Sequence, residues 1–292
     1  MIRYERLTRG QLEALIDAHN AAWRTKARVR ADAIAAAGAF LEEASIWGEI
    51  KPVFMALQHN KCVFCERLLG GALAGSVEQD VEHFRPKRKV RAWPYPGRKP
   101  KISYNFATGA SWAAGYYWLA YDLENYAAAC KPCNTARKAN HFPILGSRGA
   151  PGADIATLNA AETPLLLFPH GEHGDDPAEY LHFEGILAVP KHAACVQHQR
   201  ARVTIDFFSL NDREEIRADR FRVIQSLFFA LRTSQRDPDP EIRAAAARTI
   251  GDMISDAAPQ AACARAYLAV AQTNPQQAWD RFNEAERYLK HR

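Results

Sequence analysis

The sequence predicts an α+β protein in which a small metal-stapled core lies between two helical extensions. Two Cys-x-x-Cys pairs stand far apart in the chain, at Cys62/Cys65 and Cys130/Cys133, and turns and basic residues fill the segment between them. Patterns rich in Ala, Leu, Glu and Arg, typical of helices, lie on either side. We expect four regions: a helical extension over 1–55, a stapled core over 56–149, a loop and hairpin region over 150–205 and a helical region over 206–292.

The N-terminal segment, residues 11–58, is predicted to form two or three helices. Leu12, Leu15, Ile16 and His19 recur at the spacing of three and four residues that one face of a helix requires. We therefore expect a helical extension before the first cysteine pair.

The four paired cysteines predict a structural zinc site. Two residues between paired cysteines let a tight turn aim both sulfurs at one ion, and zinc takes four thiolates in a tetrahedron. Two disulfides, or four unrelated buried thiols, are the alternatives, but this short spacing is improbable twice by chance. Cys195 and Cys263 have no near partner in the sequence, and we expect both to be core residues.

The charge and the aromatic residues concentrate near the cysteine pairs. The net charge of +5 is too small to indicate a partner, but residues 80–101 hold eight basic residues against two acidic ones. Residues 84–126 hold eleven aromatic residues in 43 positions. We expect the aromatic cluster Tyr116–Tyr121 to pack as a core on the stapled region, and base stacking is the alternative use of the same rings.

Beyond the stapled core, the sequence predicts a hairpin and then helices. The hairpin pairs residues 181–183 with 186–189 around a Glu-Gly turn. Asn211 or Asp212 is expected to cap the next helix, and Asp239 or Pro240 to begin another.

The sequence indicates neither export nor membrane insertion. Met1–Arg6 lacks the apolar stretch of a signal peptide. The strongest apolar run, Leu165–Phe168, is far shorter than the roughly 18 residues of a membrane span. Because the cysteine spacing is of the zinc type, the cytoplasm is the expected compartment.

A Glu-His dipeptide and two asparagines near the cysteine pairs indicate phosphodiester hydrolysis. This reaction needs a divalent cation beside the phosphate and a base that deprotonates water. Adjacent residues of a strand face opposite ways, so Glu82 could face a metal while His83 faces water. A backbone carbonyl or the side-chain carbonyl of Asn125 could hold the other ring nitrogen of His83, and Asn134 could give the metal another hard oxygen ligand.

Taken singly, each of these residues has an ordinary explanation. A histidine beside Phe84 is more often structural, and an isolated asparagine is usually a turn or cap residue. Their combined positions around the two cysteine pairs, however, favour a catalytic site over four separate structural roles. In the segments Val81–Lys87, Tyr121–Tyr126 and Ala129–Asn134 the chain resembles the HNH endonucleases, a family with a ββα-metal (His-Me finger) core, here of the type with zinc knuckles made by four cysteines.

The resemblance implies a role for each residue of the set. His83 would be the general base, Asn125 the residue that orients it, and Glu82 with Asn134 the ligands of a catalytic Mg²⁺ or Mn²⁺ ion, while the zinc would be structural only. Two positions depart from the commonest pattern. Glu82 stands where Asp is more usual, and Asn134 stands where His is more usual, a change that favours Mg²⁺ or Mn²⁺ over softer metals.

Within that family, the chain resembles a bacterial subgroup associated with retrons and Septu-type antiphage defence. The segments that carry this likeness are Glu82–Lys87, Tyr117–Asp122 and Phe142–Ile144. The resemblance covers about residues 55–220. It implies nucleic acid, with DNA expected, as the substrate and an ATPase of the ABC or SMC kind as the protein partner.

Arg85, Lys87, Arg137 and Lys138 are the candidates for phosphate contacts, because a nuclease must neutralise backbone charge near the scissile bond. A solvated basic face is the alternative for each of them. The flanking helices are expected either to dock on the partner or to complete the hydrophobic core.

Two other functions compete with hydrolysis. One is a zinc-ribbon subunit that binds nucleic acid or acts as a scaffold, with its catalytic site unused. The other is a zinc-dependent nucleobase deaminase, suggested by Pro132-Cys133. A deaminase needs a His-x-Glu segment, and the residue two positions after His83 is Arg85, so we reject this function.

Overall fold

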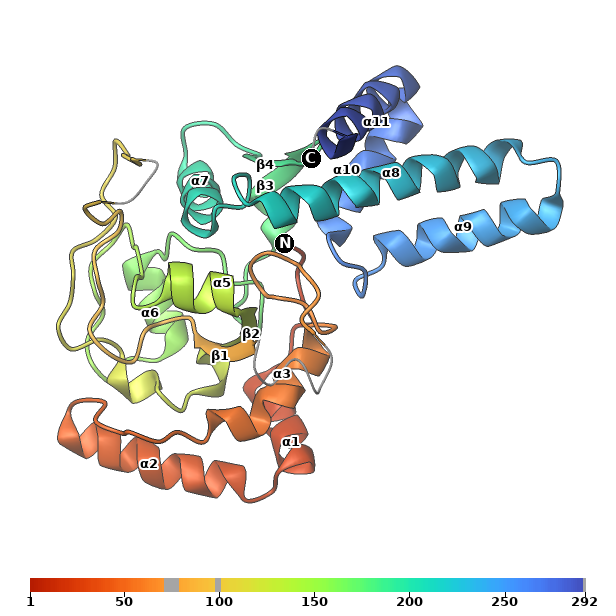
Figure 1. The fold of residues 1–292 in the computed structure, drawn as a ribbon. Helices are drawn as coiled ribbons and strands as arrows, with labels where there is room; N and C mark the ends of the chain where they lie inside the picture. The colour runs from red at the N-terminus through yellow and green to blue at the C-terminus, as the bar shows by residue number, and fades with distance from the viewer. Residues whose placement is uncertain (71–78, 98–100, 291–292) are drawn as a thin grey trace.

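The computed structural model describes residues 1–70, 79–97 and 101–290 of the chain. Arg98 and Lys99, two members of the predicted basic stretch, lie outside these residues. Figure 1 shows a body built around a two-stranded hairpin, with the N-terminal helices on one side and the C-terminal helices extending away from it. Helices combine with two small antiparallel sheets, which confirms the predicted α+β class.

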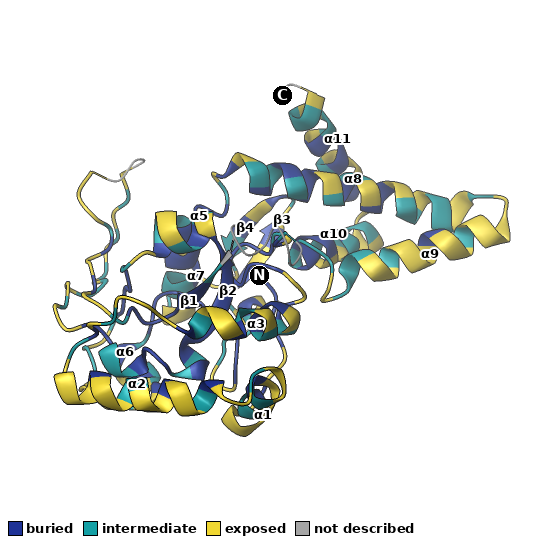
Figure 2. Ribbon diagram, turned by 60° about the horizontal axis from the view of Figure 1, so that its bottom comes forward, coloured by how far each residue is buried: buried dark blue, intermediate teal, exposed yellow. Residues whose placement is uncertain are grey.

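The N-terminal extension forms helices, as the sequence predicts: α1 (Arg9–His19), α2 (Trp23–Ala37), the 3-10 turn η1 (Trp47–Ile50) and α3 (Lys51–Leu57). Thr8 begins α1 through a capping box with Gln11, and Gly38 ends α2 in the left-handed conformation. Leu12 and Ile16 of α1 are buried, whereas the outer faces of these helices are exposed (Figure 2). The helices therefore cover one side of the body with their apolar faces.

The centre of the molecule is the antiparallel hairpin of β1 (Gln79–His83) and β2 (Tyr126–Cys130), followed at once by the short helical segments α5 (Lys131–Cys133) and η4 (Asn134–Lys138). The register pairs Glu82 with Ala127 and His83 with Tyr126. Gln58 pairs with β2 like a third strand, because its side chain donates to the Ala128 carbonyl at 2.8 Å and accepts from the Ala128 N–H at 2.7 Å.

Aromatic loops pack around the hairpin, together with the turns η2 (Tyr117–Leu119) and η3 (Leu123–Asn125) and the helix α6 (Ile155–Glu162). Tyr116 and Tyr121 are buried, which confirms the predicted core role of the aromatic cluster. Gly115 is required here: its φ is +64°, and a Cβ would lie 2.0 Å from the carbonyl oxygen of Arg88. The loop can therefore approach Arg88 only through a glycine.

The predicted second hairpin is confirmed as β3 (Leu181–Glu184) and β4 (Leu187–Pro190), preceded by the turn η5 (Pro177–Glu179). Gly185 supplies the positive φ of +60° in the connection. This small sheet lies between the body and the C-terminal helices (Figure 1).

The C-terminal region is helical, with α7 (Val196–Phe208), α8 (Glu214–Arg236), α9 (Pro240–Ile254), α10 (Ala261–Thr273) and α11 (Pro275–Lys290). Asp239 caps α9 as predicted. The predicted cap of α8 at Asn211 or Asp212 is wrong, because Arg213 occupies that position. Asn211 is used elsewhere: its amide pairs with both backbone groups of Ala188 in β4, at 2.8 Å each.

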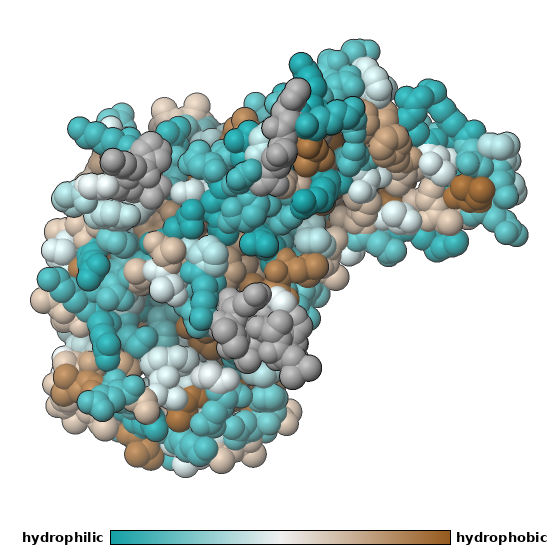
Figure 3. Space-filling model, in the orientation of Figure 1, coloured by the Kyte–Doolittle hydropathy of each residue, from teal (hydrophilic) through white to brown (hydrophobic). Residues whose placement is uncertain are grey.

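Helices α8 and α9 run side by side as a hairpin that projects from the body (Figure 1). Much of α9 is exposed (Figure 2), and Figure 3 shows mainly hydrophilic side chains on the visible face, with apolar residues in small groups. None of the described helices combines the length and the apolar character needed to cross a membrane.

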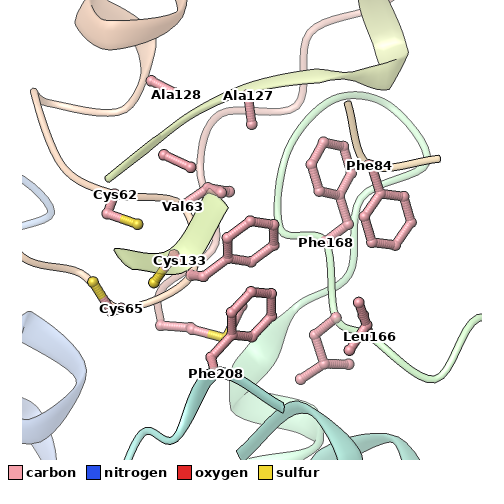
Figure 4. Close-up of a cluster of buried hydrophobic side chains, with 14 of the residues drawn as sticks. Cys62, Val63, Cys65, Phe84, Ala127, Ala128, Cys133, Leu166, Phe168 and Phe208 are labelled. Atoms are coloured by element: carbon pink, nitrogen blue, oxygen red, sulfur yellow. The ribbon is translucent and has the colours of Figure 1, made fainter. Parts of the chain in front are cut away.

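Buried side chains from all four predicted regions form one hydrophobic cluster, part of which Figure 4 draws. Near the paired cysteines, Phe64 stacks on Phe208 with ring centroids 4.0 Å apart. Cys263 is buried, as predicted. Cys195 is only half-buried, so its predicted core role is wrong: it precedes α7 at the cap position, where the chain still runs along the surface.

Arg220 joins α8 to the rest of the molecule from a fully buried position, with a relative exposure of 1%. Its guanidinium donates to the carbonyl oxygens of Ile186 and Leu210 at 2.8 Å each and to the side chain of Gln260 at 3.1 Å. Three buried acceptors therefore depend on one side chain.

Replacing Arg220 with Met is expected to lower the free energy of unfolding by roughly 3–5 kcal/mol, because the buried acceptors lose their donor. Urea denaturation of the purified protein measures the change. Arg222→Met is the matched control, since that side chain is 62% exposed on the same helix, and its effect should stay within about 0.5 kcal/mol. Equal unfolding free energies for the two variants would contradict the role assigned to Arg220.

Candidate functional site

The four paired cysteines meet in one buried cluster, three members of which Figure 4 labels. Their sulfur atoms all lie within 4.8 Å of one another, and all four are free thiols. The Sγ atoms of Cys65 and Cys130 are 3.7 Å apart, close to the roughly 3.8 Å between two sulfurs of a tetrahedral site with 2.3 Å zinc bonds. The cluster could thus hold a structural metal such as zinc, and the disulfide alternative does not describe it.

Local backbone geometry presents the sulfurs to one point. The turn at Cys62 is closed by a 3.0 Å hydrogen bond from the Glu66 N–H to the Cys62 carbonyl, with Glu66 in the left-handed region at a φ of +61°. The second pair begins at the last residue of β2, and the Cys130 N–H donates to Cys62 Sγ at 3.4 Å. The two turns are therefore tied to each other by backbone as well as by sulfur.

A buried arginine offsets the charge of the thiolates. Arg213 donates from Nη1 to Cys133 Sγ at 3.1 Å. Burial would lower the pKa of Arg213, but the nearby Cys133 and Cys65 outweigh it and raise the pKa above its ordinary value. Such a hydrogen bond to a ligating sulfur reduces the net negative charge of a four-thiolate metal site.

His83, at the end of β1, is held in one tautomer. Its Nε2 lies 3.0 Å from the carbonyl oxygen of Ala120, which can only accept, so Nε2 carries the proton and Nδ1 is left as the base. The rings of Trp47 and Tyr126 stand edge-on to it, with centroids at 4.7 and 4.9 Å. Burial, assisted by the ammonium of Lys87, lowers the pKa of His83 well below 6.5, so the imidazole is neutral.

Of the two acceptors expected for the ring of His83, the structure has a backbone carbonyl, that of Ala120, and not the side chain of Asn125. Its Oδ1 accepts from the Arg85 N–H at 2.7 Å, and its Nδ2 donates to the carbonyls of Arg85 and Leu119 at 3.0 and 3.1 Å. All three hydrogen bonds of the Asn125 side chain thus go to backbone groups, two of Arg85 and one of Leu119, the residue before Ala120. Asn125 can therefore orient His83 only indirectly, by fixing the segment whose carbonyl accepts from the ring.

Glu82 is buried beside Lys138, with a relative exposure of 2%. Lys138 Nζ lies 3.2 Å from Glu82 Oε1, but this oxygen accepts no well-directed hydrogen bond among the described residues. Burial raises the pKa of Glu82 to about 7, against the opposite influence of Lys138 and Lys87. The carboxylate is therefore only partly compensated.

Asp80, which the sequence reasoning missed, joins Asn134 to this face of the hairpin. Asn134 Nδ2 donates to Asp80 Oδ2 at 3.1 Å. Asp80 precedes Glu82 by two residues in β1, so both side chains lie on the same face. Because side chains alternate between the two faces of a strand, the sequence alone could have placed Asp80, two residues before Glu82, on the face of Glu82.

The oxygens of Asp80, Glu82 and Asn134 are donors of the type that Mg²⁺ and Mn²⁺ prefer. The under-compensated carboxylate of Glu82 fits a nearby cation. Lys138 already supplies one positive charge there, so a divalent ion would share Glu82 with the ammonium.

Two of the residues predicted to contact phosphate, Arg85 and Lys138, are buried. Arg85 is 1% exposed and pairs with Glu162 at 3.0 Å, and Lys138 is fully buried against Glu82. In a buried ion pair each cation already has its counter-charge, which corrects the prediction that Arg85 and Lys138 contact phosphate.

The other two candidates are half-buried. Lys87 places Nζ 4.4 Å from the ring centre of Trp47, and burial lowers the pKa of Lys87 to about 8. Arg137 donates to the Pro132 carbonyl at 3.2 Å. The basic stretch that follows the same motif also holds exposed cations: Arg88, Lys89, Arg91 and Lys101.

Comparison of the chain with protein-family models, with curated proteins and with solved structures finds no match. Its function therefore has to be inferred from the site and from the motifs of the sequence.

The cysteine cluster is expected to bind one zinc ion per chain, and Cys133→Ser to lose it. Because metal binding stabilises only the folded state, this variant should lose at least about 3 kcal/mol of unfolding free energy. Metal content by mass spectrometry, with denaturation on the same samples, tests both points. Cys195→Ser, outside the cluster, is the control, and equal zinc in the two variants would exclude a four-thiolate site.

Proposed function

We propose that the protein is a metal-dependent endonuclease that hydrolyses phosphodiester bonds of nucleic acid, with DNA as the expected substrate. The observation that carries the proposal is the neutral imidazole of His83, fixed through Nε2 and adjacent in β1 to the buried carboxylate of Glu82. Such neighbours can supply a base for water and an anionic ligand for a cation. The order of β1, β2 and helical η4 is consistent with the resemblance to HNH endonucleases.

His83 is proposed to act as the general base through Nδ1. Its hydrogen bond to the Ala120 carbonyl keeps the proton on Nε2 and would stabilise the imidazolium that forms when Nδ1 takes a proton from water. The same bond favours the protonated ring, in opposition to burial. Asn125 acts as a positioning residue, because it holds the Leu119 carbonyl next to that acceptor.

Glu82 and Asn134 would hold the Mg²⁺ or Mn²⁺ ion, with Asp80 hydrogen-bonded to Asn134 on the same face of β1. When bound, this ion would bind a phosphate oxygen and stabilise the leaving 3′ oxygen. Zinc at the cysteine cluster is proposed to have a structural role only, since four thiolates leave no open position for a substrate.

Exposed Arg88, Lys89 and Arg91 follow the site in sequence and could neutralise backbone phosphates without reading bases. Target choice is then left to a partner. From the sequence resemblance we keep an ATPase of the ABC or SMC kind as that partner, and antiphage defence in the cytoplasm as the setting.

The N-terminal extension covers the proposed base. His83 is 6% exposed, and Trp47 of η1 stands edge-on to its ring at 4.7 Å. The ammonium of Lys87 also contacts Trp47, with Nζ 4.4 Å from the centre of the ring. Movement of Trp47 would uncover this side of His83, so we propose a restraining role for the extension.

The same burial supports a second candidate function. Glu82 and His83 both have relative exposures below 10%, and Glu82 is paired with Lys138. A binding or scaffold subunit with an unused catalytic site would have such a closed constellation. The cleavage experiments separate the two functions.

His83→Ala is expected to slow metal-dependent cleavage of supercoiled plasmid at least about 100-fold, because the step loses its general base. Purified protein with Mn²⁺ or Mg²⁺ would be followed by the conversion of plasmid to nicked and linear forms. His182→Ala, an exposed histidine on β3, is the control and should cleave at the parent rate.

Equal cleavage by His83→Ala and the parent protein would remove His83 from the reaction. If the parent protein and Trp47→Ala both bind plasmid but neither cleaves it in Mg²⁺ or Mn²⁺, the result would favour the scaffold function.

Trp47→Ala is expected to raise the cleavage rate several-fold, because it opens the approach to His83. The same plasmid assay measures the rate, and Trp279→Ala, which truncates a partly exposed ring on α11, is the matched control. A rate that falls in Trp47→Ala while the protein stays folded would show that this ring supports the site and does not restrain it.

A further inference from the structure

The loop of residues 170–176 carries potential metal-binding side chains outside the cysteine cluster. Residues 170–176 read His-Gly-Glu-His-Gly-Asp-Asp. The loop borders a cavity of about 260 Å³, whose other walls include Phe84 and Glu124. Neither the cysteine cluster nor the proposed nuclease residues Glu82, His83 and Asn134 line this cavity.

Three potential ligands converge at this cavity. Glu124, Glu172 and His173 each place one oxygen or nitrogen atom within 4.8 Å of the others. His173 Nε2 lies 3.9 Å from Glu124 Oε1. Ligand atoms that bind one ion at roughly 2.1 Å can be at most about 4.2 Å apart, so small side-chain rotations would bring these three onto one metal.

A buried histidine gives independent support. His170 is 4% exposed and borders the same cavity, yet neither of its ring nitrogens has a hydrogen-bond partner among the described residues. The rings of Phe54 and Phe168 pack against it, at 5.5 and 6.3 Å. A buried imidazole with both nitrogens unpaired is costly, and such a group calls for a ligand or ion.

The loop is fixed before any ion binds. Asp175 Oδ2 accepts from the Phe168 N–H at 2.9 Å, and the Asp175 N–H donates back to the Phe168 carbonyl at 2.9 Å. Arg200 donates a hydrogen bond to each carboxylate oxygen of Asp175, at 2.7 and 2.8 Å. Gly174 is required for this path, because a Cβ there would lie 2.6 Å from the His170 carbonyl oxygen.

Arg9 orients Glu124, one of the three potential ligands. Its Nη2 binds Glu124 Oε2 at 2.6 Å and Asp122 Oδ2 at 2.8 Å. This contact leaves Oε1, the oxygen nearer to His173, directed toward the loop. The carboxylate is thus held from one side and available on the other.

We propose that Glu124, Glu172 and His173 bind a divalent transition-metal ion of the zinc class at this cavity, beside the unpaired imidazole of His170. One nitrogen with two carboxylates suits zinc and its neighbours better than Mg²⁺. The ion would tie the 170–176 loop to η3, the turn that carries Asn125, and so brace the segment that positions the proposed base.

Zinc binding by the full chain tests the inference without a nuclease assay. The protein would be dialysed to equilibrium against buffered zinc, and bound zinc per chain measured by mass spectrometry. The double variant Glu172→Gln/His173→Gln is expected to bind one equivalent less than the parent. Both side chains are exposed, so the fold should persist. The control, His182→Gln/Glu184→Gln, changes an exposed pair whose atoms lie 3.5 Å apart on β3, and should bind as the parent does.

Equal zinc in the parent and the Glu172→Gln/His173→Gln variant overturns the inference. A further variant, Asn134→Ala, separates this site from the nuclease site. If Asn134→Ala loses the second equivalent and the loop variant keeps it, the ion belongs to the nuclease site and the inference fails. Retention of that equivalent by Asn134→Ala, with its loss in the loop variant, supports it.

Discussion

The meeting of the two cysteine pairs is the constraint on which the rest of the structure depends. The described residues of the long segment between them lie mostly in loops. Bringing the ends of this segment together costs chain entropy, which a metal ion bound by the four sulfurs would offset. Cys130 ends β2, so the cluster fixes the strand against which β1 pairs, and that register places Glu82 and His83. Arg213 extends the same tie to the start of α8 through its hydrogen bond to Cys133.

Away from the cluster, side-chain amides replace regular strands. Three of them each pair with both backbone groups of one residue, as a neighbouring strand would: Gln58 with Ala128, Asn125 with Arg85 and Asn211 with Ala188. Buried backbone groups need such partners, and sheets of two strands leave many edges unpaired. This protein therefore supports a loop-rich core with a few buried polar side chains, each fixed by its position.

The burial of the proposed site explains its electrostatics. Glu82, His83 and Lys138 all lie in a region from which water is excluded, so the pKa of Glu82 rises and that of His83 falls. Movement of Trp47 would admit water and return both groups toward their ordinary pKa values. The N-terminal extension, which completes the hydrophobic core, would then also control the chemical state of the base and of the carboxylate.

The sequence by itself determined features that depend on local spacing. The two Cys-x-x-Cys turns, the β3–β4 hairpin and the Asp239 cap each follow from residues a few positions apart. Only the tertiary structure decided which polar groups are buried and which groups they meet. Arg85 pairs with Glu162 on α6, and His83 is held by Ala120 and covered by Trp47 from the N-terminal extension. Contacts between distant residues are set by packing, which local patterns do not encode, so these partners were not predictable.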